Sequence, residues 1–272
     1  MTTLIRTEWL KMRKYNAFWW IMGLTALSYP GVNYITYMIY DNITNQPSDA
    51  SQLAKMALGN PFAFPEAWHT VAFFSSCFVF IPAVVVIMFI CNEYTFKTHR
   101  QNIIDGWGRG QFITSKLLDV VMISLIITIL YAIVAFITGV SNQERLIKHT
   151  WDMAYYIGLF GLQTFAQLSI AFLLGFLVRK AFLALGIFLF YYIVLENIIV
   201  GFFEWKKIPL APYMPLEISD RMIPKPAFWG RLDLDAYNKS VDAIPQHVIV
   251  TIILTAIVWF VCYRINRKRD LK

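Results

Sequence analysis

The chain has 272 residues, of which 58% are hydrophobic and only 15% are charged, against roughly 25% charged residues in ordinary soluble domains. One soluble core could not hide so much apolar surface, so the composition excludes a soluble globular enzyme. Intrinsic disorder is excluded as well, because it requires low hydrophobicity together with a high net charge.

Residues 1–16 are too polar to cross a membrane, yet their pattern is amphipathic. Leu4, Ile5, Trp9 and Met12 fall on one side of a helix, whereas the other side carries threonine and lysine. An apolar face with Trp beside basic groups suits the headgroup layer. We therefore expect a cytoplasmic interfacial helix over residues 1–16; the alternative is a basic flank that only orients the next segment.

Six apolar runs follow, each close to the roughly 20 residues that a helix needs to cross a bilayer core. They predict an all-α transmembrane domain over residues 17–263. The expected spans cover residues 17–40, 68–91, 117–140, 153–178, 182–203 and 246–263. The fourth and fifth spans leave room only for a tight hairpin at Arg179 and Lys180.

The distribution of charge predicts the orientation. With the N-terminus in the cytoplasm, 15 of the 24 basic residues fall on the inner side, including those of the basic tail 264–272. Cytoplasmic segments carry such an excess of Lys and Arg, so we expect both termini inside, in a bacterial inner membrane.

The loop 92–116 between the second and third spans is long for a simple turn. The stretch Phe96 to Asp105 contains no Gly or Pro and is followed by Gly106, a typical helix stop. We expect a short helix on the cytoplasmic surface, with Phe96, Arg100, Ile103 and Ile104 able to share a face; a solvated basic loop is the alternative.

Polar side chains inside the expected spans are candidates for a translocation path or gate. Glu196, with Asn197, interrupts the fifth span, where a carboxylate is costly unless it is partnered or hydrated. Gln163 and Gln167 lie at helical spacing on the fourth span, although such amides more often join helices by hydrogen bonds. Tyr191 and Tyr192 could line a central cavity or pack in the core.

The segment 204–245 contains six of the eleven prolines, which exclude long regular helices there. We expect an external loop, either irregular or folded into a small cap that could bind a partner outside the cytoplasm.

Catalytic and metal sites are not indicated. The histidines lack zinc-ligand spacing, the three cysteines have no paired spacing, and no G-x-x-x-x-G-K-[ST] motif is present to hold nucleotide phosphates. We expect no cofactor in this chain, no enzyme activity of its own and no nucleic-acid partner.

The loop 92–116 resembles the first cytoplasmic loop of the ABC-2 family of ATP-binding-cassette permeases. The resemblance is carried by Glu93, Phe96-Lys97-Thr98, Ile103-Ile104, Gly108-Arg109 and Lys116-Leu117-Leu118. Lys97 stands where the family usually has Gly, and Gly106-Trp107 stands where Pro is common. The six expected spans, the interfacial helix and the basic tail extend the resemblance along the chain.

The resemblance implies a six-helix permease subunit, with a coupling helix in loop 92–116 and re-entrant helices or an outer gate in segment 204–245. It implies two copies of a separate cytoplasmic ATPase that binds ATP and magnesium, and a second permease copy, identical or different, within the membrane lipid. The coupling role is carried over to Glu93, Phe96, Lys97, Thr98, Arg100, Ile103, Arg109 and Lys116.

Export driven by ATP is the function that this resemblance implies. One alternative is mechanotransmission, in which the chain relays ATPase motion to an extracytoplasmic partner. A membrane-embedded enzyme using Glu196 with a His, and a structural scaffold, are the other classes left open.

Overall fold

The computed structural model describes residues 2–47, 49–104, 106, 108–143, 149–230 and 233–268. The described residues form helices and no strands, as the composition predicts. In chain order the elements are α1 (Thr2–Lys14), α2 (Asn16–Thr44), α3 (Asp49–Leu58), α4 (Ala67–Ser76), α5 (Phe80–Thr95), α6 (Thr98–Ile104), α7 (Arg109–Ser141), α8 (Tyr155–Val178), α9 (Ala181–Phe190), the π-helical turn η1 (Tyr191–Leu195), α10 (Glu196–Trp205), the 3₁₀ turn η2 (Ala211–Tyr213), α11 (Glu217–Asp220), α12 (Ala227–Gly230), α13 (Leu234–Asp242) and α14 (Ile244–Lys268).

Four of the described helices are long and apolar enough to cross a membrane. They are Gly110–Ser141, Tyr155–Val178, Ala181–Trp205 and Ile244–Lys268. They contain the third, fifth and sixth expected spans, and the fourth expected span begins two residues before its helix. The second expected span is a broken helix in which α4 and α5 meet at an angle of 50°. Counted as one crossing, this pair brings the number to five.

The first expected span, 17–40, is only partly supported. Residues Asn16–Thr44 do form one continuous helix, α2, but α2 is not among the helices that are apolar enough to cross. Its tryptophans, tyrosines and short polar side chains reduce its hydropathy. Asn33 and Thr25 are buried against the bundle, and the Asn33 side chain donates to Ser75 at 3.1 Å.

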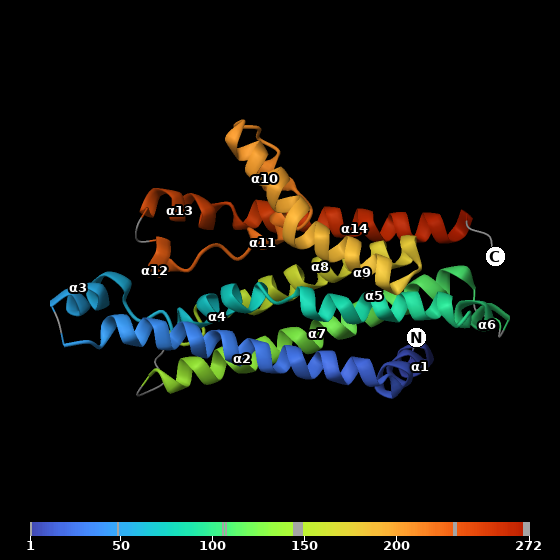
Figure 1. Cartoon of the computed structure of the whole chain (residues 1–272), viewed down its shortest axis with the longest axis horizontal. Helices are drawn as coiled ribbons and strands as arrows, with labels where there is room; N and C mark the ends of the chain where they lie inside the picture. Colours follow the sequence, from blue (N-terminus) through green and yellow to red (C-terminus); the bar gives the residue numbers. More distant parts are fainter. Residues whose placement is uncertain are drawn as a thin grey trace.

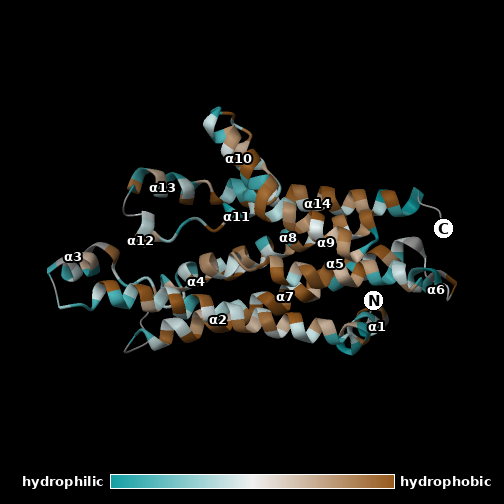
Figure 2. Cartoon of the chain, in the orientation of Figure 1, coloured by the Kyte–Doolittle hydropathy of each residue, from teal (hydrophilic) through white to brown (hydrophobic). Residues whose placement is uncertain are grey.

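Helix α8 lies at the centre of the bundle. It packs against α4, α5, α7, α9 and α14, and one side of it is buried from Tyr156 to Phe176. Hydrophobic residues dominate the long helices, whereas hydrophilic residues gather near their ends and around α11 (Figure 2). This distribution is typical of helices whose outer faces contact lipid.

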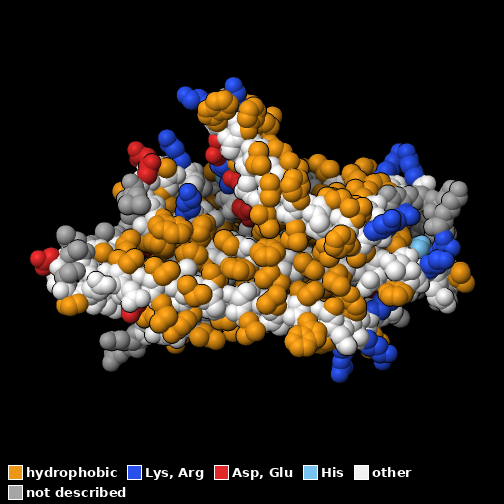
Figure 3. Space-filling model, viewed as in Figure 1, with side chains coloured by type: hydrophobic (Ala, Val, Ile, Leu, Met, Phe, Trp, Pro, Cys, Tyr) orange, Lys and Arg blue, Asp and Glu red, His pale blue; other side chains and the backbone are white. Residues whose placement is uncertain are grey.

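Helix α1, helix α6 and the C-terminal end of α14 lie at one end of the bundle, and α3, α12 and α13 lie at the other (Figure 1). On the face shown in Figure 3, Lys and Arg side chains gather at the end that carries α6. The expected hairpin at Arg179 is present: this residue has a φ of 60°, and its guanidinium lies 4.5 Å from the centre of the Tyr94 ring.

The segment 204–245 contains only short helices, as its prolines predict. It does not simply extend outward, because α11 packs against α8 and α14. Figure 2 shows the hydrophilic residues of α11 beside the apolar helices of the bundle.

Candidate functional site

A buried lysine joins three separate parts of the chain. Lys116, in the second turn of α7, is 1% exposed, and its ammonium group donates to Glu8 Oε2 at 2.6 Å, Glu93 Oε1 at 2.8 Å and Asp119 Oδ2 at 3.1 Å. An ammonium group has three N–H donors, so each donor has its own carboxylate. Glu8 belongs to α1 and Glu93 to the end of α5, and Lys116 therefore ties both helices to α7.

A second lysine completes this group. Lys11 of α1 donates to Glu8 Oε1 at 3.1 Å and to Glu93 Oε1 at 3.0 Å. Burial acts to raise the pKa of Glu8, but the charges of Lys116 and Lys11 outweigh it and leave that pKa below its ordinary value. We call Glu8, Lys11, Glu93, Lys116 and Asp119 the lysine cluster.

Helix α6 is attached to the lysine cluster through Glu93. The Thr98 hydroxyl donates to Glu93 Oε2, and His99 Nδ1 donates to the Glu93 carbonyl oxygen at 3.0 Å. His99 is buried, whereas Phe96 and Ile104 are 71% and 80% exposed. The segment thus holds its polar side against α5 and presents apolar side chains outward.

The expected coupling residues divide into two groups. Glu93, Thr98 and Lys116 meet in or at the lysine cluster, and Phe96 and Lys97 lie on the surface. Arg100 is half-buried. The side chains of Ile103 and Arg109 lie outside the described part of the chain.

The backbone at Lys97 shows how the chain accommodates a residue that differs from the resembled pattern. Its φ is 56°, in the left-handed region that Gly adopts without strain. This is the position where the resembled family usually has Gly, so the turn into α6 keeps a glycine-like backbone although the side chain differs.

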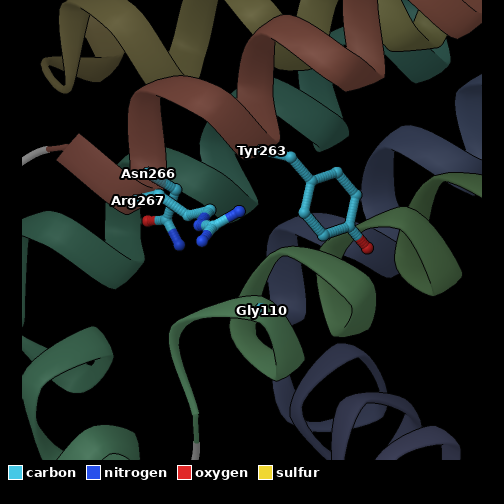
Figure 4. Close-up of a pocket in the computed structure, with 4 residues that line it drawn as sticks. All are labelled: Gly110, Tyr263, Asn266 and Arg267. Carbon is cyan, nitrogen blue, oxygen red and sulfur yellow. The ribbon is translucent and has the colours of Figure 1, made fainter.

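A cavity of about 390 Å³ lies beside the start of α7, at the same end of the molecule. Gly110 of α7 and Tyr263, Asn266 and Arg267 of α14 line it, and the two α14 side chains Asn266 and Arg267 extend over Gly110 (Figure 4). The Tyr263 hydroxyl lies 2.6 Å from that of Thr114 and fixes the end of α14 against α7.

The expected gate residues occupy a second polar group, between α8, α10 and α11. Gln163 and Gln167 are fully buried, and their side-chain nitrogens donate to Asp220 Oδ1 at 2.6 and 2.7 Å. Gln167 also donates to the Ser219 hydroxyl at 3.1 Å. The two amides therefore hold α11 against α8, which is the role that such amides more often have.

Glu196 fixes the other side of α11. Its Oε1 accepts hydrogen bonds from the backbone N–H groups of Leu216 and Glu217, at 2.7 and 2.9 Å. A carboxylate at these N–H groups satisfies donors that a helix start leaves open. We call Gln163, Gln167, Glu196, Ser219 and Asp220 the glutamine cluster.

The remaining gate candidates lie around this cluster. Tyr191 and Tyr192 are half-buried in η1, and the Tyr192 ring packs against Phe80 with ring centres 5.9 Å apart. Asn197 is exposed and donates to the backbone oxygens of Tyr192 and Ile193 in its own helix. Its side chain therefore serves its own helix and does not contact α11.

Sequence reasoning did not identify Glu8, Asp119 or Asp220 as site residues. The spacing of Glu8 to Lys11 and of Lys116 to Asp119 is a local signal, because residues three apart share a helix face. Nothing comparable marks Asp220, which lies in a proline-rich segment with no periodicity.

No metal-binding group of His, Cys, Asp and Glu is found among the residues with described positions.

Helices that can cross a membrane, packed around the central α8, define an integral membrane protein. The chain belongs to the family described as "Protein of unknown function (DUF2705)", whose family model matches residues 48–272. No curated protein matches the chain.

Proposed function

We propose that this protein is the permease subunit of an ABC-2 type transporter and works as an exporter with a separate ATPase. Under this proposal α2 is the sixth crossing, next to the five supported by their hydropathy. Its 29 residues are enough to cross a bilayer core. Tyrosine and tryptophan, which reduce its hydropathy, are common in membrane helices near the interfaces.

The observation that carries the proposal is the attachment of α6. A short surface helix with outward Phe96 and Ile104 is joined through Glu93 to the buried Lys116, and so to α1, α5 and α7. A force applied to α6 would reach three helices through directly paired charged groups. This is the arrangement that a coupling helix needs if an ATPase is to move membrane helices as rigid bodies.

The orientation in this proposal follows from the charge. The end that carries α6 also carries α1, the Arg179 turn and the basic end of α14, so this end is assigned to the cytoplasm. Helix α1 leaves Ile5, Trp9 and Leu10 exposed, which suits the cytoplasmic headgroup layer.

Affinity purification of the tagged chain from its native membrane in mild detergent tests the proposal. We expect a stoichiometric ATPase with a P-loop in the eluate, and an ATP hydrolysis rate that depends on the permease. Ile104→Asp should abolish this association. Met56→Asp is the matched control, because Met56 is 81% exposed, as Ile104 is 80% exposed, but lies on α3 at the opposite end. A preparation without any ATPase, or equal association of both variants, would refute the coupling role.

A relay to an extracytoplasmic partner is the second candidate. The short helices α3, α12 and α13, at the end opposite α6, favour it, because α3 contacts both α2 and α12 there. Replacing exposed Leu234 of α13 by Asp distinguishes the two: loss of an external partner with the ATPase retained favours relay, and an unchanged complex with altered export favours export.

A further inference from the structure

Asp220 stands at the end of α11 without a counter-ion in the described part of the chain. The described residues place no Lys, Arg or His within ion-pair distance of it. Arg221, the next residue, is already paired with Glu217 at 2.6 Å and Glu204 at 2.8 Å. Glu196 and Glu217 are also near enough for their charges to act on Asp220.

The hydrogen bonds that Asp220 does accept are neutral. They come from the Gln163 and Gln167 nitrogens and reach a single oxygen, Oδ1. Asp220 itself remains exposed. The protein atoms packed around it nevertheless reduce the hydration of its carboxylate, and this desolvation raises its pKa to about 7.

The two glutamines supply an independent sign of a missing ligand. Gln163 Oε1 and Gln167 Oε1 are buried and have no hydrogen-bond partner. Each oxygen shares a planar amide with the nitrogen that contacts Asp220, so both acceptors lie next to the carboxylate. Each unsatisfied buried acceptor costs about 1 to 3 kcal/mol of stability. A positively charged hydrogen-bond donor would satisfy both acceptors and also neutralise the nearby carboxylate.

An aromatic ring and a thiol lie in the neighbourhood of Asp220. Tyr192 and Cys77 are close enough to Asp220 for its charge to act on them. The Tyr192 ring packs against Phe80 and Phe188, at 5.9 and 5.7 Å between ring centres. Aromatic faces attract cations, and here they would also cover an apolar body. Cys77 lies in the break between α4 and α5.

We propose that Gln163, Gln167 and Asp220 bind the ammonium group of an organic cation whose apolar part lies against Tyr192. The ammonium group donates to the two amide oxygens and to the carboxylate, which satisfies all three groups at once. The inference rests on the proposed function in one respect, namely that the bound cation is the cargo.

Protection of Cys77 provides the measurement. Cys77 is exposed, whereas Cys91 and Cys262 are buried, so a maleimide reagent should modify Cys77 first. We expect 2-phenylethylammonium chloride to slow the modification of the purified full chain in a saturable way. The uncharged 2-phenylethanol and an equal concentration of potassium chloride should not slow it, and Cys77→Ser reports any background reaction.

Two variants test whether protection depends on Asp220 itself or on the negative charge of α11 in general. Asp220→Asn should weaken protection by at least tenfold. Glu217→Gln removes a charge from the same helix but from a residue already paired with Arg221, so protection should stay within about twofold.

Three results would overturn the proposal: equal protection by 2-phenylethanol, equal protection by potassium chloride, or unchanged protection in Asp220→Asn. If Asp220→Asn does not fold, the comparison of charged and uncharged probes on the unmodified chain still decides. No ATPase takes part in this experiment, so its failure and the failure of the proposed function are observed separately.

Discussion

The lysine cluster and the glutamine cluster both place carboxylates among membrane helices, but they neutralise them differently. In the lysine cluster, Lys116 and Lys11 make direct ion pairs with Glu8 and Glu93. In the glutamine cluster, Glu196 accepts from backbone N–H groups and Asp220 accepts from amide N–H groups, and neither makes an ion pair with a described residue. The first arrangement is held by charges within the chain and is suited to transmit force. The second has no counter-ion among the described residues and is suited to receive one.

Lys116→Met should have the largest effect, because it leaves Glu8, Glu93 and Asp119 buried around a neutral side chain. Breaking a buried ion pair by removing one partner costs about 3 to 5 kcal/mol. We expect a large fall in the thermal unfolding temperature of the protein in detergent. Lys206→Met is the control: Lys206 is exposed and lies over the Trp205 ring, so little change is expected. Equal effects of both substitutions would show that Lys116 does not hold the helices together.

Glu196→Leu should release α11 from α10, since it removes the acceptor for two backbone N–H groups. Hydrogen bonds to a charged group contribute about 1.5 to 3 kcal/mol each, so the local loss should be about 3 to 6 kcal/mol. Hydrogen exchange of residues 214–222 should accelerate while the exchange of α5 and α7 stays unchanged. Glu196→Gln keeps a carbonyl acceptor and should show a smaller acceleration; a uniform acceleration in all helices would contradict this local role.

The ionisation of Glu8 should make stability fall with acid. Its pKa in the folded protein is lowered from 4.5, so its contribution is present above that pH and is lost as the pH falls through the lower folded value. We expect the unfolding temperature to decrease on acidification below about pH 4.5, and the decrease to be shallower in Glu8→Gln. Parallel curves for the two proteins would show that Glu8 does not take part.

Lys97→Gly should have the smallest effect and the opposite sign. A non-glycine residue in the left-handed region costs roughly 1 to 2 kcal/mol, and glycine gives back about 0.5 to 1 kcal/mol through its greater freedom when unfolded. We expect a net gain of about 0.5 to 1 kcal/mol in the free energy of unfolding. Arg6→Gly is the control, because Arg6 is exposed in the interior of α1, where glycine should be destabilising. A loss of stability in Lys97→Gly would contradict the φ of 56°.

The parts of the fold that sequence could predict are those with local signals. The apolar runs of α7, α8 and α14 contain enough residues to be recognised by length alone, and Gly106, with a φ of 95°, follows α6 as a helix stop. The broken α4 and α5 pair was expected as one span because its break, at Cys77, is as apolar as its flanks.

The sites were harder to predict because their contacts are distant along the chain. Lys116 and Glu8 are separated by 108 residues, and Gln163 and Asp220 by 57. Periodicity identifies the face on which Gln163 and Gln167 lie, but it gives no indication of which loop returns to that face. The position of Asp220 depends on the packing of α11 against α8, which no local pattern in the sequence indicates.

The partnership of Glu8 with Lys116 also constrains how the protein is made. Glu8 is synthesised 108 residues before its main partner, which at about 5 to 20 residues per second is a delay on the order of 5 to 20 seconds. During that time α1 has Lys11 as a partner for Glu8 but has no α7 to bury it. Helix α1 can therefore take its final position only after the start of α7 is in place to bury Glu8.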